Sequence, residues 1–106
     1  MSVKKQFSSF EDMLQESSTP VLVDFYAPWC GPCQMMGPIL DEVNRRLDGQ
    51  VKVVKINTDK YPELASRYQI GALPTLALFQ GGEVRERLEG VVPAEQLVAR
   101  IQQVLA

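Results

Sequence analysis

A nearly continuous apolar run at positions 21–26 limits the folds open to this chain more than any other feature, and the segment 51–56 predicts a second buried strand. A strand with apolar side chains on both faces is typical of a sheet that is covered on both sides. The segment after the first run has apolar residues at spacings of three and four, which predicts a helix. These residues are Met36, Ile39, Leu40, Val43 and Leu47. The strand–helix–strand order predicts an α/β fold with a right-handed crossover.

Residues that favour helix starts predict three more helices. Ser9 resembles an N-cap before the apolar stripe Phe10, Met13 and Leu14. Pro62 suits the first turn of a short helix at 62–68, and Pro93 opens a helix near the end of the chain. The inward face of that last helix is expected to carry Leu97, Val98, Ile101 and Leu105.

Proline and glycine predict the irregular points of the fold. Pro38 should bend the long second helix, because it has no amide proton, and Gly49 should end that helix. Gly81-Gly82 predicts a hairpin between a strand at 75–79 and the segment 84–89. The sum is a mixed sheet between layers of helices, with functional groups at the carboxyl ends of its parallel strands.

Composition limits the partners and the chemistry. With 106 residues we expect a single domain over 1–106. Eleven basic and thirteen acidic residues are scattered along the chain, and the longest apolar stretch is interrupted by Asp24. We therefore expect no nucleic-acid and no membrane partner. The absence of histidine excludes His-based general-base catalysis and most zinc sites. Without a recognisable leader, the chain is expected to be cytoplasmic or a mature form.

Cys30 and Cys33 form a Cys-x-x-Cys motif where a strand turns into a helix. Near the helix N-cap, free backbone amides and the helix dipole favour a thiolate on Cys30. Cys33 follows almost one turn later and is expected to be the more buried of the two, positioned to attack a mixed disulfide on Cys30. A half zinc site lacks the other two ligands, and two inert thiols would not explain this placement. The motif therefore predicts a redox pair.

The segment Trp29-Cys30-Gly31-Pro32-Cys33 resembles the active-site signature of the thioredoxin family. The resemblance covers essentially the whole chain and includes residues 23–25, Pro38, 55–57, 73–75, 81–83 and Gly90. Residues 60–65 and 90–94 look more like the y-type thioredoxins of plastids and cyanobacteria. The resemblance implies a central mixed five-stranded sheet flanked by four helices. It also allows the plastid stroma as the location of a mature form.

The resemblance implies that Asp24 and Lys55 join the two cysteines in the catalytic set. In the family, the matching aspartate lies behind the active site and assists deprotonation of the second cysteine, here Cys33. Burial would raise the pKa of Asp24 and suit it to accept a proton. Position alone leaves open that Asp24 is exposed at a strand end. Lys55 is expected to moderate the charge of Asp24; taken alone, it is simply a solvent-facing lysine.

The resemblance also implies a flat apolar patch that docks substrates. Pro74 resembles the family's cis-proline opposite the cysteines, and a cis bond would let the backbone of Leu73 pair with an extended substrate segment. For Trp29 and Leu73, ordinary packing is the alternative. The patch is expected to comprise Trp29, Gly31, Pro32, Ala72, Leu73, Pro74, Gly90 and Val91.

We predict a protein disulfide reductase and electron carrier without cofactor or metal, acting as a monomer. The resemblance implies an NADPH- or ferredoxin-dependent thioredoxin reductase as electron donor, and disulfide-containing targets such as peroxiredoxins. Gly31-Pro32 resembles the reducing members, but an oxidase, an isomerase or a non-catalytic binding module remain alternatives. Gln34, Tyr26 and Leu73 replace residues that are frequent in the family, which puts partner preference in doubt.

Overall fold

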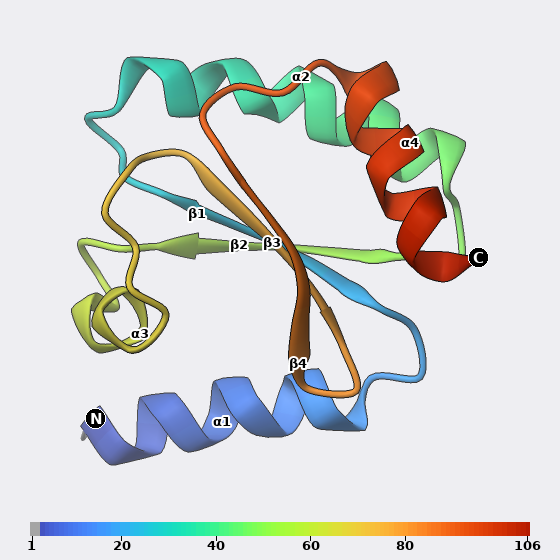
Figure 1. Cartoon of the computed structure of the whole chain (residues 1–106). Coiled ribbons are helices and arrows are strands. Elements are labelled where there is room, and N and C mark those ends of the chain that lie inside the picture. The colour runs from blue at the N-terminus through green and yellow to red at the C-terminus, as the bar shows by residue number, and fades with distance from the viewer. Residues whose placement is uncertain (1–2) are drawn as a thin grey trace.

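The computed structural model describes residues 3–106, which form four helices and four strands (Figure 1). Most of these segments are helices or strands as the spacing of their apolar residues predicts. In chain order they are α1 (Val3–Glu16), β1 (Val21–Tyr26), α2 (Gly31–Arg46), β2 (Lys52–Asn57), α3 (Pro62–Arg67), β3 (Thr75–Gln80), β4 (Glu83–Glu89) and α4 (Ala94–Leu105).

The sheet has the strand order β2-β1-β3-β4. Strand β1 runs parallel to β2 and antiparallel to β3, and β3 runs antiparallel to β4. The sheet is therefore mixed, as predicted. The parallel register places Asp24 of β1 beside Lys55 of β2.

The expectation of a fifth strand is wrong for the described residues 3–106, where the sheet has four. The segment before β1 is helix α1. Two adjacent residues of this helix, Met13 and Leu14, both pack on the core. A strand would send two adjacent side chains to opposite faces, whereas a helix keeps them on one. Helix α1 also begins at Val3 instead of following a cap at Ser9, so Ser9 lies inside the helix.

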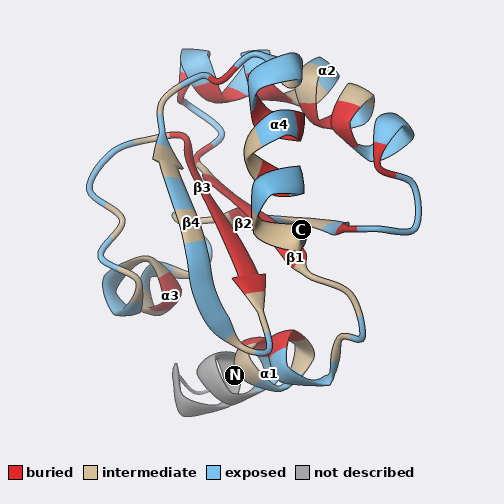
Figure 2. Cartoon of the chain, turned by 45° about the vertical axis from the view of Figure 1, so that its right-hand side comes forward, coloured by how far each residue is buried: buried red, intermediate tan, exposed pale blue. Residues whose placement is uncertain are grey.

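Helices cover both faces of the sheet (Figure 1). Helices α1 and α3 lie on one face, where a core cluster includes Phe10, Phe25 and Phe79. Helices α2 and α4 lie on the other, over a cluster that includes Leu22, Leu40 and Ile101. Strands β1 and β3 are almost fully buried between these layers, while β4 is largely exposed (Figure 2). The apolar run at 21–26 is thus a strand covered on both faces, as predicted. Strand β2 lies at the edge of the sheet and is only partly buried, so the expectation of a second buried strand at 51–56 is wrong.

The predicted turns occur close to their expected positions. Gly81 and Gly82 join β3 to β4 with φ of 61° and 84°, the left-handed backbone that such a hairpin needs. Pro38 lies inside α2, which ends at Arg46, three residues before Gly49. Among the described residues, no helix has the length and apolar character to cross a membrane.

Candidate active site

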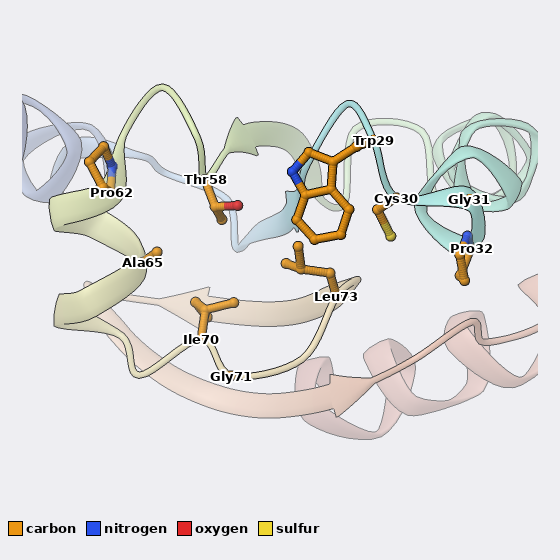
Figure 3. A pocket seen from close by; sticks show the side chains of 10 residues that line it. All are labelled: Trp29, Cys30, Gly31, Pro32, Thr58, Pro62, Ala65, Ile70, Gly71 and Leu73. Carbon is orange, nitrogen blue, oxygen red and sulfur yellow. The ribbon is translucent and has the colours of Figure 1, made fainter.

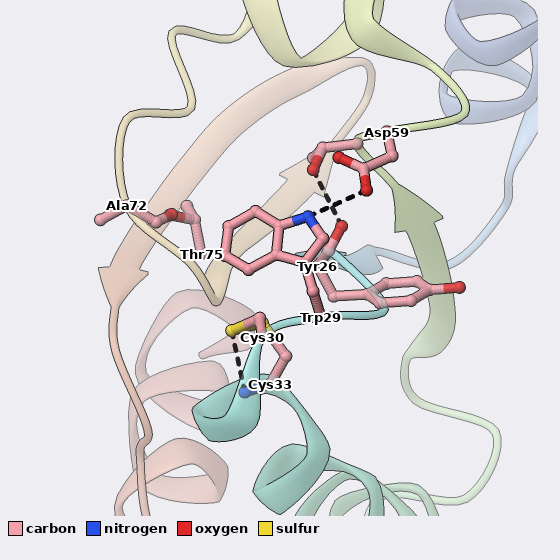
Figure 4. The surroundings of a disulfide bond; sticks show 8 residues. Tyr26, Trp29, Cys30, Cys33, Asp59, Ala72 and Thr75 are labelled. Atoms are coloured by element: carbon pink, nitrogen blue, oxygen red, sulfur yellow. Dashed lines mark hydrogen bonds between the residues drawn. A yellow bond between two sulfur atoms is a disulfide. The ribbon is translucent and has the colours of Figure 1, made fainter.

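Cys30 and Cys33 lie where β1 leads into α2, and their sulfur atoms form a disulfide (Figure 4). Cys30 is the N-cap of α2, with extended backbone, and the Cα atoms of the pair are 5.3 Å apart. The backbone amide of Cys33 donates a hydrogen bond to Cys30 Sγ over 3.2 Å. The prediction of a closely spaced redox pair is confirmed.

The start of α2 favours negative charge on Cys30 Sγ. The first amides of a helix have no partner within the helix, and here one of them points at the sulfur. The 16-residue length of α2 adds the positive end of its dipole at the same place. Both effects stabilise a thiolate relative to a thiol when the pair is reduced.

The two cysteines are buried to a similar degree, but they face different hollows of the surface. Their exposed fractions are 5% for Cys30 and 7% for Cys33, so the expectation of a more buried Cys33 is wrong. The fold places both thiols in one small cluster with Ala27, beneath Tyr26 and Leu73. Cys30 lines an open groove, and Cys33 lines a second cavity.

The groove beside Cys30 has a volume of about 550 Å³ (Figure 3). Four of the predicted docking residues line it: Trp29, Gly31, Pro32 and Leu73. Trp29 is 72% exposed and lies over Leu73 at one side of the groove. Half of the expected patch therefore lines an open groove, and one rim of this groove is formed by a tryptophan that is exposed to solvent.

The other four predicted docking residues do not line this groove. Pro74 is buried and follows a cis peptide bond, as the resemblance implied. Its carbonyl accepts a hydrogen bond of 2.8 Å from the Gly90 amide, next to the exposed Val91. The carbonyl of the exposed Ala72 accepts a bond of 2.6 Å from the Thr75 hydroxyl.

The far wall of the groove comes from residues that the sequence analysis missed: Thr58, Pro62, Ala65, Ile70 and Gly71. They belong to α3 and its flanking loops, and no motif near the cysteines points to them. A further omission is Asp59, whose carboxylate accepts a hydrogen bond of 2.9 Å from the Trp29 indole (Figure 4). The crossover from β2 through α3 to β3 brings these residues to the cysteines.

Asp24, Cys33 and Lys55 line the second cavity, of about 350 Å³. Asp24 is only 2% exposed, and its Oδ1 has no hydrogen-bond partner among the described residues. Burial raises the pKa of Asp24 from 3.8 to about 6, against the opposing effect of the Lys55 charge. Of the two interpretations of Asp24, the buried carboxylate is the correct one. Lys55 is exposed and also borders the cavity, as does Gln34.

Comparisons with known proteins agree with this arrangement. Residues 1–103 match the family model described as Thioredoxin. The chain is 59% identical over 102 residues to the thioredoxin-like protein slr0233 of Synechocystis, covering 96% of this chain and 97% of that protein. It is 60% identical over 99 residues to chloroplastic thioredoxin Y2 of Arabidopsis thaliana, covering 93% of this chain and 59% of that protein.

The fold also matches a solved structure, that of chloroplastic thioredoxin z. The TM-score is 0.84 at 36% identity, and the match covers 92% of this chain and 88% of the other. The chain spans about three fifths of the chloroplastic y-type relatives and nearly all of the Synechocystis protein. The family model, these relatives and the disulfide at the start of α2 lead to one conclusion: the chain belongs to the thioredoxin family of dithiol–disulfide oxidoreductases.

Proposed function

We propose that Cys30 is the attacking thiolate of a protein disulfide reductase and that Cys33 is the resolving thiol. The observation that carries this assignment is the amide of Cys33, which donates to Cys30 Sγ at the N-terminus of α2. Cys30 also borders the open groove, where a second protein has access. Cys33 borders the separate cavity that holds Asp24.

In the first step, the thiolate of reduced Cys30 attacks one sulfur of a target disulfide. A bond forms between Cys30 Sγ and that sulfur, the target S–S bond breaks, and the other target sulfur leaves as a thiolate. In the second step, the Cys33 thiol passes its proton to Asp24 and attacks Cys30 Sγ. The second target sulfur then leaves, and the pair is left in the disulfide state that the structure contains. An external reductase returns two electrons.

Asp24 is suited to accept the proton of Cys33 because both residues line the same cavity. A pKa of about 6 lies close enough to neutrality for Asp24 to accept and release a proton during turnover. Lys55 is its parallel neighbour on β2 and limits how far the pKa rises. We therefore assign Asp24 as the proton acceptor and Lys55 as the residue that tunes it.

The groove is the proposed docking site for the target protein. Strand β3 begins at Thr75, so the main chain of Leu73 lies outside the β3 ladder, and the Leu73 side chain packs against the cluster that contains Cys30. An extended target segment could pair with this main chain while its apolar side chains enter the groove. The other predicted docking residues (Ala72, Pro74, Gly90 and Val91) are proposed to flank the docked segment on the β3–β4 side.

The assignment is tested with single cysteine variants in an insulin reduction assay. Cys30→Ser should abolish reduction, because the nucleophile is lost. Cys33→Ser should retain the first attack and accumulate a mixed disulfide with the target, which is visible on a non-reducing gel. Full activity of Cys30→Ser would overturn the proposal, as would a mixed disulfide trapped on Cys33 when Cys30 is the residue replaced.

We further propose that the chain is a y-type thioredoxin that transports electrons as a monomer and a single domain. Identities of 54–60% to the chloroplastic Y thioredoxins and to the Synechocystis protein support this subtype. The location would be a cyanobacterial cytoplasm or a plastid stroma. Reduction rates with ferredoxin-dependent and NADPH-dependent thioredoxin reductases identify the electron donor, and peroxiredoxins are the first targets to assay.

A further inference from the structure

We propose that Arg87 of β4 is a positioning residue for the docking groove: its guanidinium clamps the C-terminus of α3 and so fixes the loop that forms one wall of the groove. This inference rests on the proposed use of the groove for substrate docking. Arg87 itself lies outside the groove lining. Its side chain extends from the edge strand β4 to the end of α3. The proposed reaction steps use no residue of β4.

The C-terminus of α3 is a place where a helix of six residues needs outside support. The helix ends at Arg67 with Tyr68 as its C-cap, and Gln69 follows with φ of 53°. The Gln69 amide donates to the Ser66 carbonyl over 3.1 Å, and the Ile70 amide donates to the Ala65 carbonyl over 2.9 Å. This pattern is a Schellman motif, in which glycine is the usual residue at the position that Gln69 occupies.

Arg87 binds two carbonyls that the bonds of this motif do not use. Its Nη1 donates to the Tyr68 carbonyl and its Nη2 to the Gln69 carbonyl, each over 2.6 Å. A planar guanidinium suits two neighbouring acceptors, and a positive charge is favourable at the C-terminus of a helix. The Glu89 carboxylate lies 3.7 Å from the same Nη2 and helps to hold the fork in place.

The sheet register explains why Arg87 can reach α3. Arg87 pairs with Ala77 of β3, whose side chain belongs to the core cluster beneath α1 and α3. Directly paired residues of antiparallel strands point to the same face of the sheet. The Arg87 side chain therefore leaves β4 on the α3 side.

The clamped residues lead straight into the groove. Ile70, Gly71 and Leu73 follow Gln69 in sequence and all line the groove, with Ile70 and Gly71 in its far wall (Figure 3). The later end of this loop is held by the Thr75 hydroxyl bond to the Ala72 carbonyl. Without Arg87, the earlier end would keep the packing of Tyr68 and Ile70 against the core, but its backbone would depend on a cap whose left-handed residue, Gln69, is not glycine. The loop would then sample conformations in which the wall does not fit an extended target.

The test compares three variants with the wild-type protein. Arg87→Gln removes the charged fork, and Arg87→Lys keeps the charge without the planar fork. Arg85→Gln is the matched control, because it removes the same charge two residues away on β4, where Arg85 bonds to Gln80. The measurements are insulin reduction, reduction of the small disulfide DTNB, and hydrogen exchange of the Ile70 amide by NMR.

For Arg87→Gln we expect the KM for insulin to rise roughly 3- to 10-fold at unchanged kcat, the scale of losing a partly exposed charge-assisted hydrogen bond. DTNB reduction should stay at the wild-type rate, since a small disulfide does not need the groove wall. The Ile70 amide should exchange faster by a similar factor. Arg87→Lys should resemble Arg87→Gln, and Arg85→Gln should resemble the wild type.

Three results would overturn the clamp: unchanged Ile70 exchange in Arg87→Gln, an unchanged KM for insulin, or an equal loss of insulin and DTNB reduction. Equal loss would mean a general effect on the fold or on the cysteines. Hydrogen exchange does not depend on catalysis. A wild-type protein inactive toward insulin would therefore refute the proposed function, whereas unchanged exchange at Ile70 refutes the clamp itself.

Discussion

Replacing Asp24 by Asn should raise the stability of the oxidised protein relative to the wild type as the pH rises. Asp24 is buried, and burial raises its pKa from 3.8 to about 6. Between these two values the folded state holds a proton on Asp24 that the unfolded state has released. The wild type therefore loses stability as the pH rises through this window, and the loss levels off above about pH 6.

The magnitude follows from the size of the pKa shift. A rise of about two units is worth roughly 3 kcal/mol, at about 1.4 kcal/mol per unit. Asn has the same shape but no charge, so it avoids this cost at high pH. Its buried amide could itself lack partners, at a cost of about 1–3 kcal/mol. That cost does not depend on pH. The pH dependence of the difference in unfolding free energy between the variant and the wild type therefore reports only the effect of the Asp24 charge.

The assay is urea unfolding of the oxidised wild type and Asp24→Asn, with the disulfide intact so that the cysteines do not titrate. The free energy of unfolding of Asp24→Asn minus that of the wild type should increase by about 2 kcal/mol between about pH 4.5 and about pH 7.5. Asp48→Asn, the same change at an exposed position, is the matched control and should follow the wild-type profile. A difference that stays constant across this range for Asp24→Asn would refute the reasoning.

Three further predictions concern single contacts. Lys55→Gln should shift the midpoint of the pH dependence of stability to higher pH, because the Lys55 charge lowers the pKa of the buried Asp24. An unchanged midpoint in the same urea unfolding series would contradict this. Asp59→Ala should lower the fluorescence anisotropy of Trp29, the only tryptophan, because its indole loses a hydrogen bond of 2.9 Å; wild-type anisotropy would mean that the bond does not restrain the ring. Gly82→Ala should lower the free energy of unfolding by at least about 1 kcal/mol, owing to positive φ, and by more than Gly81→Ala. The added methyl at Gly82 would also lie 2.8 Å from a side-chain atom of α1, and equal losses in urea unfolding would show that this contact relaxes freely.

The local elements could be predicted because their signals lie within a few residues of one another. The run at 21–26 is strand β1, and the apolar spacing after the cysteines is the buried face of α2. The two glycines before Glu83 form the hairpin. Where an expectation came from the family resemblance alone, it was less secure: the fifth strand is wrong for residues 3–106, whereas the cis bond before Pro74 is confirmed.

The site is only partly visible in the sequence. Cys30, Cys33 and Trp29 share one short segment, so the motif identifies them together. Ile70 and Asp59 reach the same site only through the crossover from β2 to β3, and they carry no motif. The equal burial of the two cysteines also depends on what covers them, which spacing does not reveal.

The sequence by itself determined the order and type of most elements, the redox pair and its place at a helix start. These depend on side-chain periodicity and on the reach of neighbouring backbone amides. Only the tertiary structure decided that Asp24 is desolvated, that a groove borders Cys30, and that Arg87 binds the two carbonyls at the end of α3. Burial and long-range contacts depend on which distant segments the sheet brings together, and no short stretch of the chain contains that information.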